Sequence, residues 1–67
     1  MSRTTVNGVP TYVAPGTTVA DLVAVRCASP KGVAVALNGE VVPRSTWEAT
    51  AVATGDDVEI VTAAAGG

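Results

Sequence analysis

The segment TVADLVAVRCASP, residues 18–30, carries the only helical pattern in the sequence. Its apolar side chains recur at helical spacing and form a single stripe, at Val19, Leu22, Val23 and Cys27. Thr18 and Asp21, three residues apart, resemble an N-cap signal in which Asp replaces the usual Glu. Because Pro30 disfavours helical geometry in the residue before it, the pattern predicts a helix that ends around residues 28–29.

The segments on both sides of this helix have the pattern of β-hairpins. RTTVNGVPTYVA at 3–14 and VAVALNGEVV at 33–42 each place an Asn-Gly dipeptide between two β-rich runs. This dipeptide tolerates the positive φ angles of a tight turn, so we expect turns at residues 7–8 and 38–39. The run at 33–37 is continuously apolar, which indicates either burial on both faces or pairing beside the helix.

The remaining segments predict short connections and one more strand. PRSTWEAT at 43–50 lacks a strand pattern and predicts a short turn or a single helical turn. TGDD at 54–57 predicts a turn that leads into a last strand at 58–61. One helix and four or five strands cannot form a helical bundle or a sandwich. The sequence therefore predicts an α+β fold, with a mixed four- to five-stranded sheet packed on one helix.

A sheet that holds one helix in this order is the ubiquitin-like β-grasp arrangement, in which the last strand lies centrally beside the first. We therefore expect a β-grasp domain over residues 1–61. The remaining residues, TAAAGG at 62–67, are expected to leave the sheet at Thr62 as a flexible C-terminal tail. Its last two glycines have no side chain to bury and the largest entropy cost of ordering.

The composition gives one small domain with an unusual core. The chain has 67 residues, is 48% hydrophobic and contains no Phe, with Tyr12 and Trp47 as its aromatic residues. Its core must therefore be built from small and β-branched side chains, which favour strands. Since there is little polar surface to cover the apolar groups, we expect an exposed apolar patch, a feature that often marks a partner surface.

The charge pattern argues against binding to nucleic acid. The formal net charge is −2 with a pI near 4.6, and the four basic residues are scattered, at Arg3, Arg26, Lys31 and Arg44. No apolar run approaches the length of a membrane span, and no signal peptide is visible, so we expect a soluble cytoplasmic protein, a monomer when free. A single cysteine, Cys27, is consistent with a reducing compartment.

The sequence lacks the residue sets on which most enzymes depend. It contains no His, and its one cysteine cannot build a zinc site, so we expect no catalytic residue, no metal and no bound cofactor. The glycines before the tail are isolated and form no phosphate-binding loop. Asp56-Asp57 is the one adjacent carboxylate pair, and it is typical of a turn. The chain is therefore not expected to be an enzyme by itself.

Three side chains have both a structural and a functional interpretation. Cys27, on the helical stripe, is expected to behave as a small hydrophobic residue, the alternative being a reactive thiol if it is exposed. Trp47 either covers the open end of a core that lacks large side chains or anchors an interface together with Arg44, because Trp and Arg are enriched at binding hot spots. Trp47 and Arg44 are thus candidate partner-binding residues.

The chain resembles the ThiS family, the sulfur carrier proteins of thiamine biosynthesis. The resemblance rests on the placement of Asn38-Gly39, Val42-Pro43-Arg44, Trp47 and Gly55-Asp56, and on a four-residue spacer before Gly66-Gly67. It covers the whole chain and is strongest from residue 37 onward. The spacer departs from the family, because it is all alanine after Thr62 where larger aliphatic residues are common.

The resemblance implies a specific chemistry for the tail. An E1-like adenylyltransferase would use MgATP to convert the Gly67 carboxylate to an acyl-adenylate. A persulfide sulfur donor would then convert it to a thiocarboxylate, and thiazole synthase would take this sulfur for the thiazole moiety of thiamine. Gly67 would be the reactive residue, and Gly66, Ala65 and Ala64 would contact the partner enzymes.

Three alternatives remain from the sequence. The first is the sulfur carrier subunit of molybdopterin synthase, which has a similar fold and also ends in Gly-Gly. The second is a ubiquitin-like modifier that is joined to target lysines through Gly67. The third is an interaction module whose tail is inert. The segment at 43–47 and the short length favour the thiamine branch.

Overall fold

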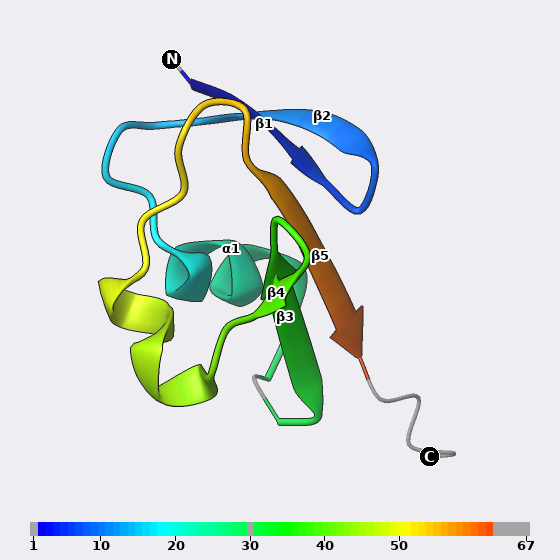
Figure 1. Cartoon of the computed structure of the whole chain (residues 1–67). Helices are drawn as coiled ribbons and strands as arrows, with labels where there is room; N and C mark the ends of the chain where they lie inside the picture. The colour runs from blue at the N-terminus through cyan, green and yellow to red at the C-terminus, as the bar shows by residue number, and fades with distance from the viewer. Residues whose placement is uncertain (1, 30, 63–67) are drawn as a thin grey trace.

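The computed structural model describes residues 2–29 and 31–62, which form one mixed sheet and two helices (Figure 1). The elements in chain order are β1 (Ser2–Val6), β2 (Val9–Val13), α1 (Val19–Arg26), β3 (Val33–Leu37), β4 (Glu40–Val41), the 3₁₀ helix η1 (Arg44–Ala49) and β5 (Asp57–Thr62). The strands form a five-stranded sheet in the order β2-β1-β5-β3-β4. β1 and β5 are parallel, and the other pairs are antiparallel. The predicted fold class is confirmed, including the central position of the last strand.

Both hairpin turns lie at the predicted Asn-Gly dipeptides. Asn7 and Gly8 have φ angles of 52° and 80°, and Asn38 and Gly39 have φ angles of 53° and 84°. Positive φ at both central residues matches the right-handed twist of the flanking strands, which is why Asn and Gly are favoured at these positions. The first turn joins two strands of five residues each, whereas β4 after the second turn has only two residues.

Helix α1 begins with the predicted capping box. The Thr18 hydroxyl accepts a hydrogen bond from the Asp21 N–H at 3.2 Å, and the Asp21 carboxylate accepts one from the Thr18 N–H at 3.0 Å. The helix ends at Arg26, two residues before the predicted end. Cys27 adopts an extended backbone (φ −128°, ψ 136°) while its N–H still bonds to the Val23 carbonyl at 2.8 Å, so the chain leaves the helix there.

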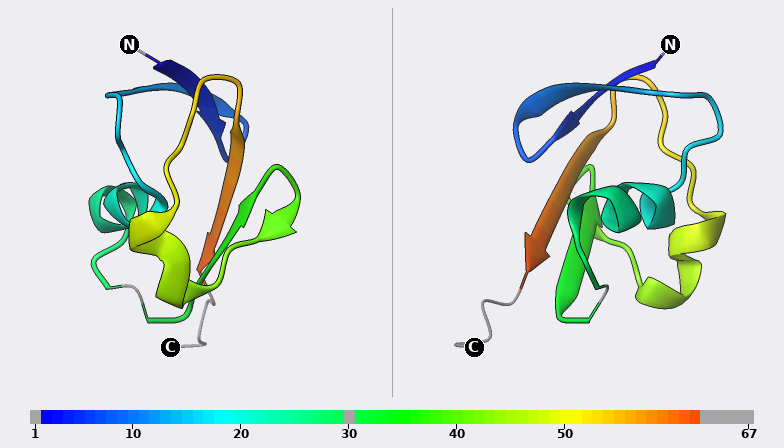
Figure 2. Two further views of the ribbon diagram at one scale, coloured as in Figure 1. Left: turned by 60° about the vertical axis from the view of Figure 1, so that its left-hand side comes forward. Right: turned by 180° about the vertical axis from the view of Figure 1, so that it is seen from behind.

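The core lies between one face of the sheet and the two helices (Figure 2). Figure 2 shows α1 and η1 on the same side of the sheet. The buried side chains are mostly valines, and Trp47 of η1 is the one large aromatic among them: Val6, Val13, Val19, Leu22, Val23, Val35, Val42, Trp47, Val52, Val58 and Ile60. Small β-branched residues thus fill the core, as the composition predicted.

The structure decides one open alternative for the predicted strands and corrects the end of another strand. In β3 only Val35 is fully buried and Ala34 is exposed, so this apolar run pairs beside the helix and is not buried on both faces. Thr62, expected as the first residue of the tail, is the last residue of β5 and pairs with Val33. Beyond residue 61 the chain therefore stays in the sheet for one more residue. No helix among residues 2–29 and 31–62 is long and apolar enough to cross a membrane.

Candidate functional site

β5 is the strand from which the tail continues, and neighbouring strands hold it on both sides. Its side chains alternate, with Val58 and Ile60 buried and Glu59 and Val61 exposed. It pairs with β3 over its last five residues, from Val58 to Thr62, and with β1 only over its first two, Asp57 and Val58. Because β5 is paired on both sides and has two buried side chains, its position in the sheet is fixed at the point where the following residues begin.

Both Asn-Gly turns also bond to β5 through their asparagine side chains. The Asn7 amide donates to the Ile60 carbonyl at 3.1 Å and accepts from the Ile60 N–H at 2.7 Å. The Asn38 amide donates to the Asp56 carboxylate at 3.0 Å and accepts from the Asp57 N–H at 2.9 Å. Sequence reasoning assigned these residues to the turns alone, because nothing local indicates a partner 53 residues away.

Of the pair Asp56-Asp57, only Asp56 lies in the predicted turn region, because Asp57 is the first residue of β5 and pairs with Thr5. The Asp56 carboxylate accepts a hydrogen bond from the Ala53 N–H at 2.7 Å, which closes the loop before β5. The Asp56 carbonyl accepts from the Thr4 hydroxyl and from the Thr5 N–H, which joins the loop to β1. No group of three or more Asp, Glu, Cys or His that could hold a metal occurs in the described part of the chain.

The outer face of the sheet carries an exposed apolar patch next to the end of β5. Ala34 stands opposite Val61, and Ala36 stands opposite Val41, all on the face away from α1 because the intervening Val35 is buried. Val41 is 77% exposed and Val61 is 61% exposed. We call Ala34, Ala36, Val41 and Val61 the outer patch. It confirms the exposed apolar patch expected from the composition, and it lies on the strand that leads to the tail.

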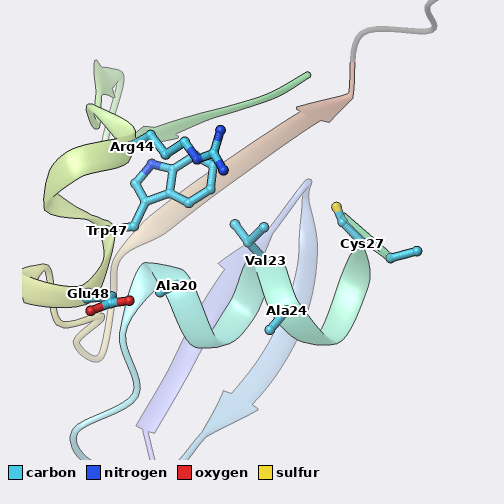
Figure 3. Close-up of a pocket in the computed structure, with 8 residues that line it drawn as sticks. Ala20, Val23, Ala24, Cys27, Arg44, Trp47 and Glu48 are labelled. Carbon is cyan, nitrogen blue, oxygen red and sulfur yellow. The ribbon is translucent and has the colours of Figure 1, made fainter. Parts of the chain in front are cut away.

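A hollow of about 370 Å³ lies between α1 and η1. Figure 3 shows that α1 and the chain just after it line one side and η1 the other; the lining residues are Ala20, Val23, Ala24, Cys27, Ala28, Arg44, Trp47 and Glu48. Cys27 is half-buried and packs against the core, which confirms its interpretation as a small hydrophobic residue. Small alanine side chains on α1 leave this space open beside the Trp47 ring.

Trp47 is a core residue in this structure. It is 5% exposed, and its indole N–H donates to the Val42 carbonyl at 2.9 Å. It therefore covers the end of a core that lacks other large side chains, and only part of it faces the hollow. Arg44 is exposed on the same helix. That Trp47 and Arg44 bind a partner stays a prediction.

Four residues of the predicted tail are predicted site residues, and all four lie outside the described residues: Ala64, Ala65, Gly66 and Gly67. The structure places the start of the tail, because Thr62 ends the central strand. It brings the outer patch close to that point through the pairing of Val61 with Ala34. Arg44 and Trp47 lie on η1, whose hollow is on the opposite side of the sheet, the side of α1.

Comparison with known proteins identifies the relatives of this chain. The ThiS family model matches residues 4–67. A crystal structure of the thiamine biosynthesis protein ThiS from Geobacter metallireducens is 41% identical, with a TM-score of 0.80, and the match covers 97% of this chain and 99% of that one. A solution structure of a thiamine biosynthesis protein from the same organism is 40% identical, with a TM-score of 0.76, and the match covers 97% and 87% of the two chains. No protein with a curated function matches the chain. With a family match over nearly its whole length and the same fold as these relatives, the chain belongs to the ThiS family.

Proposed function

We propose that this protein is a sulfur carrier of thiamine biosynthesis whose Gly67 carboxylate is adenylated and then converted to a thiocarboxylate. The observation that carries the proposal is the ThiS family match over residues 4–67, which includes Gly66 and Gly67. The β-grasp body supports it, because the central strand β5 ends at Thr62, only five residues before Gly67. The carrier is a cosubstrate, and the sulfur that it delivers is used to form the thiazole moiety.

Activation is needed because a carboxylate is a poor electrophile. An E1-like adenylyltransferase would join the Gly67 carboxylate to the AMP part of MgATP and release pyrophosphate. The partner would supply Mg²⁺ and the electrostatic stabilisation of the developing charge. Sulfide would displace AMP and leave the thiocarboxylate. With a persulfide donor the terminal sulfur would attack, and a thiol would then cleave the sulfur–sulfur bond.

The lengths and residue types beyond β5 suit this chemistry. Five residues follow Thr62, and an extended chain of that length spans at most about 18 Å. This reach would let Gly67 enter a buried active site while the body stays outside. Gly66 and Gly67 have no Cβ, so the backbone can pass through a narrow channel and adopt dihedrals that other residues avoid. Ala64 and Ala65 would contact the walls of this channel.

We further propose that the outer patch is the surface that docks on the adenylating enzyme. Val61 and its partner Ala34 lie near the end of β5, and Ala36 and Val41 continue the patch across β3 and β4, so a partner that binds the tail would reach this surface at the same time. Val61 and Val41 are large exposed apolar side chains, and a protein surface of this kind is typical of interfaces. The partner surface would be apolar, with a basic group opposite Glu59, which stands beside Ala36 on the same face.

The experiment that tests the carrier function is an intact-mass measurement. The protein is incubated with MgATP, a ThiS-adenylating enzyme and sulfide, and we expect a mass increase that matches one oxygen exchanged for sulfur. Gly66→Ala should leave the fold intact and slow this reaction sharply, and deletion of Gly67 should abolish it. An unchanged mass with an enzyme that activates another ThiS protein would refute the proposal, and exclusive activation by a molybdopterin-synthase adenylating enzyme would assign the chain to that pathway.

The docking surface is tested with a charge placed on the patch. Val61→Glu should raise the KM for the carrier in ATP–pyrophosphate exchange roughly tenfold or more, because a charge at the centre of an apolar interface loses its hydration. Val25→Glu is the matched control, since Val25 is 85% exposed on α1, which covers the opposite face of the sheet. Equal KM values for the two variants would exclude the outer patch as the docking surface.

A further inference from the structure

Asn7 connects the first turn to the last strand in a way that the turn itself does not require. It lies at the first central position of the β1–β2 turn, with φ 52°. Its side-chain amide donates to the Ile60 carbonyl at 3.1 Å and accepts from the Ile60 N–H at 2.7 Å. One side chain thus satisfies both backbone groups of a residue 53 positions away, as a neighbouring strand would do in a ladder.

This contact replaces strand pairing that β1 cannot provide. β1 pairs with β5 only at Thr5–Asp57 and Val6–Val58, and the Asn7 N–H then donates to the Val58 carbonyl at 2.8 Å. After this point the chain turns away into β2. Backbone groups that face β1 alternate along β5, so Ile60 is the next residue whose N–H and C=O point toward that side. The Asn7 side chain forms hydrogen bonds with both groups. It thus extends the attachment on this side of β5 from Val58 to Ile60.

On the other side of β5 the pairing with β3 continues to its end, where Val33 pairs with Thr62. Without the Asn7 side chain, the second half of β5 would be held from one side only. A strand held from one side can twist and pivot about its remaining neighbour, because the hydrogen bonds of a single ladder resist that motion weakly. Ile60 is two residues before the end of β5, so such a pivot would change the direction in which the chain leaves the sheet.

We propose that Asn7 is a positioning residue of the sulfur carrier. By holding Ile60, it fixes the direction in which residues 63–67 leave β5 and so helps to present Gly67 to the adenylating enzyme. Asn7 does not touch the reacting atoms, and it acts through the strand. This inference rests on the proposed function, because it assigns a role in delivering the carboxylate that the function requires.

Asn38 provides a matched control within the same chain. It has the same φ within one degree, the same glycine after it, and a side chain that also makes two hydrogen bonds near β5. Its partners, Asp56 and Asp57, lie at the start of the strand, at the end opposite to the tail. Glycine tolerates the positive φ at both positions, so Asn7→Gly and Asn38→Gly each remove a side chain without straining the turn.

The test is ATP–pyrophosphate exchange with a ThiS-adenylating enzyme, at a temperature where circular dichroism shows both variants folded. Asn7→Gly should raise the KM for the carrier roughly two- to tenfold, the range expected when a segment must be ordered at binding. Its kcat should change little, and Asn38→Gly should keep the wild-type KM. Equal KM values for Asn7→Gly and the wild type would overturn the inference, as would an equal rise in both variants.

Asn7→Asp separates the two hydrogen bonds. The carboxylate still accepts from the Ile60 N–H and Asp tolerates this backbone, but an oxygen now faces the Ile60 carbonyl in place of the amide donor. We expect a rise in KM at least as large as for Asn7→Gly. A wild-type KM for this variant would count against positioning through the Ile60 carbonyl and would overturn the assignment.

Amide hydrogen exchange gives a readout that does not depend on activity. In Asn7→Gly, the Ile60 amide should exchange faster than in the wild type, whereas Asn38→Gly should leave it unchanged. Unchanged exchange at Ile60 in Asn7→Gly would show that the contact does not hold the strand. If the wild-type chain is activated and the Asn7 variants behave like it, only this inference fails. If the wild-type chain is not activated, the proposed function fails with it.

Discussion

The two Asn-Gly turns of this molecule share a backbone and differ in what their side chains hold. The φ angles at the first turn are 52° and 80°, and those at the second are 53° and 84°. Asn7 bonds to the backbone of Ile60, a residue that is 7% exposed, in the second half of β5. Asn38 bonds to the carboxylate of Asp56 and to the exposed Asp57 at the start of the same strand.

The difference shows that a local sequence signal can specify a turn without specifying the role of its side chain. Gly after Asn allows the positive φ angles in both cases. The side-chain amide is then free to bond to whatever the tertiary structure places beside it. The value of the bonds depends on that neighbour, because a polar group left unpaired in a half-buried place costs more than one that water can reach.

Apolar packing is expected to stabilise β5 more than the asparagine side chain of either turn does. Val58 is fully buried and pairs with Val6 on one side and Leu37 on the other. Val58→Ala should lower the free energy of unfolding by roughly 2–3 kcal/mol, from lost apolar burial and the cavity that remains. Urea denaturation followed by circular dichroism measures this value. A loss smaller than that caused by Asn7→Gly would mean that hydrogen bonds hold the strand more firmly than packing does.

Asn7→Gly tests the stronger of the two side-chain attachments. It leaves the Ile60 N–H and C=O without their partner in a part-buried place, so we expect a loss of about 2 kcal/mol in the free energy of unfolding. The same urea experiment measures it. The slope of the transition should stay the same as in the wild type, since the folded state keeps its surface. A loss below that of Asn38→Gly would reverse the comparison of the two turns.

Local signals explain why so much of the fold could be predicted. Three of these signals act within a few residues, so the local sequence alone predicts their geometry: the Asn-Gly turns, the Thr18–Asp21 capping box and the apolar stripe of α1. The Asn7–Ile60 contact was not predictable in this way, because its partner is set by the parallel pairing of β1 with β5. For the same reason the sequence did not show that Thr62 pairs with Val33, since the length of β5 is set by β3.

The same distinction between local signals and tertiary contacts applies to the candidate site. The exposed apolar patch followed from a composition with too little polar surface, but its position on β3, β4 and β5 required the strand register. Trp47 had two interpretations from the sequence; the structure places it in the core with its N–H on Val42, and its role in binding a partner stays a prediction. Gly67 was inferred from the resemblance of the whole chain to a known family, through body positions such as Asn38-Gly39 and Trp47 together with the Gly66-Gly67 end.

The glycines of the two turns provide a control in which only the backbone is tested. Gly8 and Gly39 have φ angles of 80° and 84°, and a Cβ added at either would meet no atom within 4 Å. Gly8→Ala and Gly39→Ala should therefore each cost about 1–2 kcal/mol from the left-handed backbone alone, and by nearly the same amount. Thermal or urea unfolding of the pair checks this. Clearly unequal losses would show that the two backbones differ in solution.

Asn38→Gly is expected to have the smallest effect. Its two hydrogen bonds lie on exposed groups, so water can replace both partners once the amide is gone, and the loss should be about 0.5–1 kcal/mol. Removal of the amide also leaves the Asp56 carboxylate its bond from the Ala53 N–H, which keeps the loop closed. A loss equal to that of Asn7→Gly would mean that burial does not distinguish the turns. The double variant Asn7→Gly/Asn38→Gly sharpens the test. Because the two attachments lie at opposite ends of β5, their losses in the free energy of unfolding should add. A coupling energy well above about 0.5 kcal/mol would show that the strand responds as one rigid unit.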